Sequence, residues 1–279
     1  MSSILTNNSA MVALQTMKQI NRNMGDVQNQ ISTGMKVSSA KDNAAVWSIA
    51  KVMESDVNGL NAIRESLSVG SATVGTARNA AESVTGLLTM AKERILGGGD
   101  LTTEDSRNKL VADLNAIGDQ IATIVESASF NGVNLLDNAD TYNIISSLAR
   151  DNAGALTAKT IEVDASDISA IAGVLQGWDE TNLANQTAID ATLGALETQL
   201  GLAIDAAAAF GTAQKQIEIQ SDFVGNFMDS LKSGIGALVD ADMEEASARL
   251  QALQVQQQLA TQSLSIANQQ PQNILALFR

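Results

Sequence analysis

The sequence predicts a mainly α-helical protein, a long antiparallel helical rod or coiled coil with a small β-containing segment near its centre. Apolar residues recur at spacings of three and four over most of the 279 residues, as they do along one face of a helix. A single proline, Pro271, leaves room for very long helices. Aromatic residues make up only 3% of the chain, which favours thin aliphatic cores over a bulky globular centre.

The first expected helix lies close to the amino terminus. Its apolar stripe keeps the helical spacing without a miss until Gly34 interrupts it. Ser39 and Asp42 have the spacing of a capping box, so we expect a new helix to start there. The stripe consists of Ala10, Ala13, Met17, Ile20, Met24, Val27 and Ile31.

The longest stripe runs from Leu60 to Ile95, and within it only Gly70 departs from an apolar residue. A helix of this length measures about 54 Å at 1.5 Å per residue. Because that is too long for a compact domain of this size, the stripe predicts a rod. The glycines at positions 97–99 end the helix.

A third helix is expected after these glycines. Thr102 and Asp105 are spaced as a capping box, and an apolar stripe follows from Leu110 to Ala128. The stretch FNGVNLL comes next, and its Asn131-Gly132 pair predicts a tight turn because both residues tolerate positive φ.

Residues 138–190 read differently, because the stripes fade and small polar residues dominate. Residues 161–164 alternate as in a half-buried strand, so we expect short strands, turns and one or two short helices here. Thr187 and Asp190 then predict the start of the last helical run.

The last helical run contains two apolar stripes, one from Leu193 to Ile235 and one from Val239 to Leu264. The second is shifted by four residues, which is a stutter in the heptad pattern. Gly234 and Gly236 lie beside the shift, so the sequence predicts a hinge or a domain boundary there.

Charge is distributed unevenly along the chain. Residues 1–40 carry three basic residues against one acidic residue, and residues 243–279 carry two of each. The net charge of −14 therefore comes from the middle, which holds −16. Such acidity disfavours nucleic acid and anionic membranes as partners. The near-neutral, amphipathic ends must pair with each other or with other copies, and without a partner they should be largely disordered.

Composition argues against an enzyme. The chain has neither cysteine nor histidine, which removes thiol chemistry, the commonest general base and the commonest metal ligand. Residues 97–100 lack the lysine of a phosphate-binding loop. An acidic cluster lacks the spacing of an EF-hand calcium-binding loop and fits the start of a helix better. This cluster consists of Asp240, Asp242, Glu244 and Glu245. We predict no catalytic residue, no metal and no cofactor.

Targeting signals are inconspicuous. The first 17 residues contain no basic residue and no apolar run, so no secretory signal peptide is expected. No apolar run is long enough for a bilayer. These signals alone would predict a cytoplasmic protein, and only the family resemblance described next points elsewhere.

Three segments carry recognisable motifs: ISTGMKVSSAKDNAAV at 31–46, FNGVNLL at 130–136 and the carboxyl-terminal residues 238–279. Together they resemble bacterial flagellins, in particular short members that lack large outer domains. The first segment is similar to the flagellin amino-terminal signature, and the second is similar to its FNG motif. Residues 238–279, with the ending ANQQPQNILALFR, resemble the flagellin carboxyl end. The resemblance covers roughly residues 1–136 and 205–279.

The resemblance implies a structural subunit that self-assembles into the flagellar filament used for swimming. Residues 1–40 and 237–279 would form an inner terminal coiled-coil domain, and residues 41–236 a helical rod with a variable tip around 138–190. The protein would be extracellular, leaving the cell without a cleavable signal peptide through the flagellar type III export apparatus. An export chaperone, the filament cap and hook-junction proteins would be its other partners.

The apolar residues of the two ends are the predicted polymerisation residues. A charge placed among them should abolish polymerisation. They are Met17, Ile20, Met24, Val27, Ile31, Met243, Leu250, Leu253, Leu264, Leu275 and Phe278.

One position departs from the family pattern. Flagellins that the animal innate receptor detects carry an LQRxREL-like stretch, and Met90 occupies the place of its first arginine. Because methionine cannot replace the five-donor guanidinium, we predict weak or absent receptor activation.

Other functions remain as alternatives. The first is a hook–filament junction protein of the same family, and the second is a secreted effector or adhesin with a coiled-coil body. A flagellin carrying a zinc peptidase with an HExxH motif is excluded because the chain has no histidine.

Overall fold

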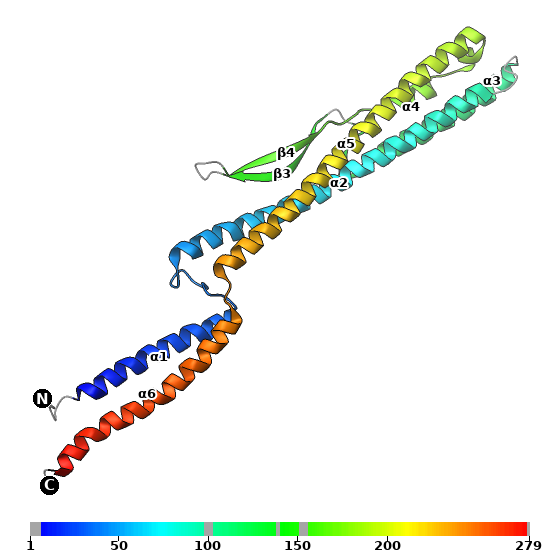
Figure 1. Ribbon diagram of the computed structural model, residues 1–279. Coiled ribbons are helices and arrows are strands. Elements are labelled where there is room, and N and C mark those ends of the chain that lie inside the picture. Colours follow the sequence, from blue (N-terminus) through cyan, green and yellow to red (C-terminus); the bar gives the residue numbers. More distant parts are fainter. Residues whose placement is uncertain (1–6, 98–102, 138–139, 151–155, 278–279) are drawn as a thin grey trace. The chain divides into compact units, whose positions relative to one another are not determined.

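The computed structural model describes residues 7–97, 103–137, 140–150 and 156–277, and it is predominantly helical (Figure 1). The mainly α-helical fold with a small amount of β structure is confirmed. Its helices are α1 (Asn8–Thr33), α2 (Ala44–Gly97), α3 (Glu104–Ser127), α4 (Ala170–Gln176), the 3-10 helix η1 (Glu180–Leu183), α5 (Gln186–Val239) and α6 (Met243–Leu277). Its strands are β1 (Ser129–Phe130), β2 (Val133–Asn134), β3 (Tyr142–Arg150) and β4 (Leu156–Val163).

The chain divides into two compact units. The first comprises residues 1–57 and 229–279, and the second comprises residues 58–228. The breaks between α1 and α2 and between α5 and α6, near which the sequence analysis sets its domain boundaries, both lie within the first unit. No helix in the described ranges combines the length and the apolar character needed to cross a membrane.

Helices α1 and α6 pack against each other in the first unit. The amide of Asn7 donates to the carbonyl of Ala267 (2.8 Å), so the start of α1 lies beside the carboxyl-terminal part of α6 and the pair is antiparallel. Helix α1 ends at Gly34, as predicted, with φ at 71° and its N–H bonded to the carbonyl of Gln30 (2.8 Å). Glycine suits this left-handed position because it has no Cβ.

The two connections of the first unit are hydrogen-bonded to each other. The N–H groups of Lys36 and Val37 donate to the carbonyl of Val239, and the N–H of Ala241 donates to the carbonyl of Gly34. Helix α5 continues through Gly234 and Gly236, and the interruption comes only after Val239. The predicted phase shift is therefore realised as a helix break a few residues beyond the glycines.

Three helix starts differ from the predicted capping boxes. The side-chain oxygen of Asn43 caps α2 by accepting from the N–H of Val46 (3.2 Å), and Asn185 caps α5 through the N–H of Ala188 (2.9 Å). Thr103 caps α3, whereas Thr102 lies outside the described residues. The predicted cap positions Ser39, Thr102 and Thr187 are therefore one to four residues away from the residues that cap these helices. The Asp42 side chain does reach back to the N–H of Ser39 (2.9 Å), but it does so in the turn before α2.

The second unit is built on α2 and α5, whose parts in this unit run side by side (Figure 1). The long predicted stripe is its core, and the side chains of Leu67, Val74 and Leu88 are completely buried. Helix α3 lies along α4, and its stripe from Leu110 is likewise buried at Leu114 and Ile121. The periodicity therefore identified the core face of each long helix correctly.

Two hairpins complete the second unit. Strands β1 and β2 are joined by Asn131 (φ 50°) and Gly132 (φ 80°), which confirms the predicted tight turn. Strands β3 and β4 pair antiparallel, with an irregularity between Ile145 and Ser147. Ile161 and Val163 are buried, as predicted from their alternation, but the strands extend well beyond residues 161–164.

The β3–β4 hairpin is attached to the long helices. The Gln220 amide of α5 donates to the carbonyl of Ser146 (2.9 Å), and the Ser146 hydroxyl donates to the carbonyl of Lys159 (3.0 Å). Ser146 is buried, so these bonds satisfy polar groups that are shielded from water. Helix and strands are thereby joined by specific bonds as well as by apolar contact.

Candidate functional site

Most of the predicted polymerisation residues lie between α1 and α6 of one chain. Ile20, Val27 and Leu253 are buried there together with Ala246 and Ala260. Four more of the predicted residues pack against the same core and are partly buried. The sequence left open whether the ends pair with each other or with other copies, and within one chain they pair with each other. The four residues are Met17, Met24, Ile31 and Leu250.

Two further predicted residues, Met243 and Leu264, are not part of this core. Met243 at the start of α6 is 43% exposed, and Leu264 is half-buried. Leu275 belongs to α6, but its side chain is outside the described part of the structure, as is Phe278 altogether. The members of the predicted set whose side chains are described therefore divide into a core within the chain and two residues outside it.

A second apolar stripe, which the sequence analysis missed, lies on the water-facing side of the pair. On α6 it comprises Val255, Leu259 and Ile266, which are 55%, 58% and 63% exposed. On α1, Met11 and Val12 are exposed in the same way. The spacings of four and seven on α6 are those of one helix face, so the sequence does contain a signal for this stripe. It was missed because only one apolar stripe was assigned to this part of the chain.

Shallow grooves accompany the second stripe. One groove of about 420 Å³ is lined by Ile20, Leu259 and Ala260 together with polar side chains of both helices. Another of about 500 Å³ is lined by Val12 and Ala267 among others. The α1–α6 pair therefore presents an uneven, partly apolar surface to water after its own core has formed.

Two polar contacts between uncharged groups join α1 and α6 in the described part of the chain. The Gln257 amide donates to the Asn21 side-chain oxygen (2.8 Å), and the Asn7 amide donates to the carbonyl of Ala267 (2.8 Å). Amide contacts of this kind fix the register of the two helices without introducing a charge that burial between copies would penalise.

The carboxylate of Asp42 organises the turn that precedes α2. Its Oδ2 accepts from the N–H groups of Ser38 (3.1 Å) and Ser39 (2.9 Å) and from both serine hydroxyls. Hydrogen bonds from Ser39, first from its backbone and then from its hydroxyl, lower the pKa of Asp42 below its ordinary value.

The acidic cluster near residue 242 forms a helix start, as predicted. The Asp242 side chain accepts from the N–H groups of Glu244 (2.9 Å) and Glu245 (3.1 Å) at the beginning of α6. Acidic side chains are favourable at this end of a helix. Across the described ranges, no three acidic side chains come together in a way that could hold a metal ion.

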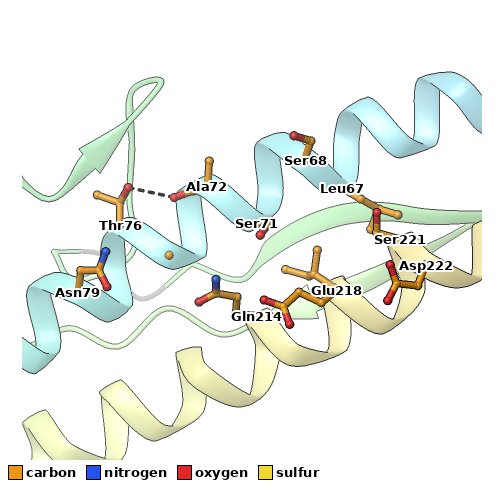
Figure 2. Close-up of a pocket in the computed structure, with 12 residues that line it drawn as sticks. Leu67, Ser68, Ser71, Ala72, Thr76, Asn79, Gln214, Glu218, Ser221 and Asp222 are labelled. Atoms are coloured by element: carbon orange, nitrogen blue, oxygen red, sulfur yellow. Dashed lines mark hydrogen bonds between the residues drawn. The ribbon is translucent and has the colours of Figure 1, made fainter. Parts of the chain in front are cut away.

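A groove of about 740 Å³ lies between α2 and α5 in the second unit. Figure 2 shows the Gln214 amide and the Glu218 carboxylate between the two helices. The Thr76 hydroxyl donates to the carbonyl of Ala72, and Glu218 pairs with Lys215 (3.3 Å), so both groups are already engaged. The arrangement is that of a polar cleft between helices rather than of a nucleophile beside a base. The same groove is also lined by these residues labelled in Figure 2: Leu67, Ser68, Ser71, Asn79, Ser221 and Asp222.

Long helices whose two ends pair and then leave a further apolar stripe in water define a class of helical, self-assembling structural proteins. Residues 4–141 match the bacterial flagellin N-terminal helical region, and residues 179–278 match the bacterial flagellin C-terminal helical region. The chain therefore belongs to the bacterial flagellin family.

Similar proteins extend over the whole chain. A flagellin of Brucella melitensis biotype 1 is 39% identical over 283 aligned positions, covering 100% of both chains. The flagellin FljM of Caulobacter vibrioides is 37% identical, covering 100% of this chain and 99% of its own. The end-to-end coverage includes the segment between the two family regions.

A solved structure shares the fold. The structure of a putative flagellar hook-associated protein from Vibrio parahaemolyticus superposes with a TM-score of 0.55 over 71% of this chain and 100% of its own. Its sequence identity is 13%, so this likeness concerns the fold alone. The relatives named flagellin match at much higher identity, and nothing favours the hook–filament junction alternative.

The function follows from the family. The protein is a structural subunit that assembles with copies of itself into the extracellular filament of the bacterial flagellum, and it is not an enzyme. Its functional site is therefore a set of surfaces that copies bury against one another.

Proposed function

We propose that the α1–α6 pair is the polymerisation element of this filament subunit. Residues 1–40 and 237–279 form its inner terminal domain, and residues 41–236 form the rod, with a variable tip around 138–190. The observation that supports this proposal is the second apolar stripe, because Val255, Leu259 and Ile266 stay exposed to water after the pair has formed its core.

The predicted polymerisation residues take two roles in this proposal. Those between the helices, such as Val27 and Leu253, make the pair a stable unit. Met243, Leu264, Leu275 and Phe278 join the second stripe in contacts with neighbouring copies. Burying one large aliphatic side chain contributes about 1.5–3 kcal/mol, so a few such contacts repeated along a filament suffice for stable assembly.

The proposed route out of the cell is the flagellar type III export apparatus, without a cleavable signal peptide. The pair of terminal helices supports this route. Its core is thin and consists of small and aliphatic side chains such as Ala246 and Ala260, so it unfolds at low cost. An export chaperone, the filament cap and hook-junction proteins are the proposed partners before and during assembly.

Seeded polymerisation tests the proposed element. Purified subunit is added to short filament seeds, elongation is followed by electron microscopy, and helicity is measured by circular dichroism before and after. Leu250→Asp and Leu264→Asp should abolish elongation, because each places a charge in a surface that becomes dry. Ser247→Asp is the control, since Ser247 is an exposed polar residue of the same helix. Normal filaments from both leucine variants would refute the proposal.

A further inference from the structure

The exposed turn between β1 and β2 leaves an asparagine–glycine pair open to chemical reaction. Asn131 and Gly132 are both exposed, and their φ angles of 50° and 80° are those of a tight two-residue hairpin turn. A Cβ built on Gly132 would meet no atom within 4 Å, so the space beside the turn is open. Within the described part of the chain, the N–H of Gly132 makes no backbone hydrogen bond, because the second central residue of such a turn has no partner in it.

Asparagine followed by glycine can lose its side-chain amide without an enzyme. The backbone nitrogen of the glycine attacks Cγ of the asparagine and closes a five-membered succinimide ring. The side-chain nitrogen takes up the proton of the attacking N–H and leaves as ammonia. Water then opens the ring at one of its two carbonyl groups, which gives either aspartate or isoaspartate, in which the main chain passes through the side-chain carboxyl group. Glycine favours the attack because it has no Cβ to hinder it.

A second asparagine–glycine pair, Asn58-Gly59, provides a comparison within the same chain. Asn58 is exposed too, but it lies inside α2, where the N–H of Gly59 is bonded to the carbonyl four residues earlier. A Cβ built on Gly59 would lie 3.3 Å from Cδ2 of Leu148, so the β3–β4 hairpin packs against this glycine. The fixed helical backbone keeps the nitrogen of Gly59 away from Cγ of Asn58, so reaction there requires α2 to unwind.

The turn at Asn131, by contrast, can open without unwinding a long element. Strands β1 and β2 have two residues each, and an isolated hairpin of this size has little stability of its own. Short exposed segments of this kind open at the lowest free energy in a fold. The structure therefore separates two identical pairs. One lies on a turn that can rearrange toward the succinimide while the rest of the unit stays folded, and the other is held in a helix.

Isoaspartate would change the structure beyond the turn itself. It adds one methylene to the backbone between Phe130 and Val133, which pair across the hairpin. The next residue, Asn134, ties the hairpin to α3, since its amide donates to the carbonyl of Val125 (2.8 Å). The side-chain oxygen of Asn134 also accepts from the N–H of Leu136 (2.9 Å). A longer turn displaces Asn134 and weakens its hold on the end of α3.

We propose that Asn131 is a site of spontaneous deamidation in the folded subunit, and that isoaspartate accumulates in the β1–β2 turn as the protein ages. Water is the only co-reactant, and α2 protects Asn58 from the same reaction. This modification lies in the second unit and is independent of the polymerisation element in α1 and α6.

Peptide mapping by mass spectrometry measures both pairs in one sample, because trypsin places them in separate peptides, residues 52–64 and 110–150. Purified full-length subunit is incubated near neutral pH, and fragmentation locates the conversion of the amide to a carboxyl group. In the folded subunit Asn131 should react at least about tenfold faster than Asn58, because opening the turn requires less free energy than unwinding α2. In urea the two pairs should react within about threefold of each other, since no fold protects either.

Asn131→Gly is the matched control, because glycine also suits the positive φ of the turn but has no side chain that can react. Aged wild-type subunit should be labelled by an isoaspartate methyltransferase, and its Leu136 amide should exchange faster than in fresh subunit. Aged Asn131→Gly should show neither change. A folded subunit in which Asn131 reacts no faster than Asn58 would overturn the proposal, and so would an Asn131 that stays unmodified in the folded subunit while it reacts in urea.

Discussion

Ile144 of β3 fills the space that a side chain on Gly70 of α2 would need. A Cβ built on Gly70 would lie 2.6 Å from Cδ1 of Ile144 and 2.9 Å from its Cγ1 and Cγ2. Ile144 is only 2% exposed, so it has little room to withdraw. The one departure from the longest apolar stripe is thus the position where the β3–β4 hairpin docks.

Gly70→Ala should destabilise the second unit. Alanine favours a helix over glycine, but the new methyl group would overlap a buried, branched side chain. Overpacking of this kind costs about 1–3 kcal/mol, so the steric effect should exceed the gain in helix propensity. The free energy of unfolding, measured with a chemical denaturant, should fall by the steric cost minus the propensity gain of about 0.5–1 kcal/mol, and amide exchange in β3 and β4 should accelerate.

Gly86→Ala is the matched control on the same helix. No atom lies within 4 Å of a Cβ built on Gly86, so only the propensity effect remains. The control should raise the free energy of unfolding by about 0.5–1 kcal/mol. If both alanine variants stabilise the protein equally, the packing of Ile144 against α2 does not require a glycine at position 70.

The apolar stripes could be predicted from sequence because burial on a long helix imposes a regular spacing. The stripe through Leu67, Val74 and Leu88 was identified in this way, and all three are fully buried. The turn at Asn131-Gly132 was predictable for a different reason, since few residue pairs tolerate two successive positive φ angles.

The partners of these faces could not be predicted, because periodicity says that a face is buried but not what covers it. Docking of Ile144 at Gly70 joins segments 74 positions apart, and no local pattern encodes that contact. The stripe of Leu259 was missed because it lies outside the core of the single chain, where Leu259 is 58% exposed, and only the proposed contact with a neighbouring copy accounts for it.

The hydrogen bonds to Asp42 predict a pH-dependent stability. The bonds from Ser39 and Ser38 hold the pKa of Asp42 below its ordinary value of 3.8 in the folded chain. Since the folded pKa is the lower one, the stabilisation is fully present above about pH 4 and is lost as the pH falls through the folded pKa. In Asp42→Asn, the difference in unfolding free energy from the wild type should be constant near neutral pH and shrink in acid. A difference that stays constant down to pH 2 would show that the carboxylate is not responsible.

Met90 bears on recognition by the innate receptor of animals. It lies on α2 and is 46% exposed, so the side chain at this position is available to a partner of the free subunit. We expect purified subunit to activate receptor-bearing reporter cells weakly, and Met90→Arg to strengthen the response because it supplies the guanidinium donors. Leu96→Arg, at another exposed apolar position of α2, controls for added charge alone. A full response to the wild-type subunit would contradict the prediction.

Two leucines on α6 separate folding from assembly. Leu253 is 6% exposed in the α1–α6 core, whereas Leu259 is 58% exposed on the second stripe. Leu253→Ala should weaken the helix pair by about 2–4 kcal/mol, because it leaves a cavity between the helices, and the helicity of the free subunit should fall. Leu259→Ala should leave helicity unchanged and alter stability by no more than about 0.5 kcal/mol.

Filament formation should rank the two leucine variants differently. Leu259→Ala removes apolar area that only a neighbouring copy covers, so the subunit concentration needed for elongation should rise while the free subunit stays folded. Leu253→Ala should raise that concentration only in proportion to the fraction of subunits in which α1 and α6 are no longer paired. An osmolyte that restores helicity should therefore also restore elongation. If Leu259→Ala polymerised like the wild type, the second stripe would have to face water in the filament. The terminal pair would then contact its neighbours through some other face.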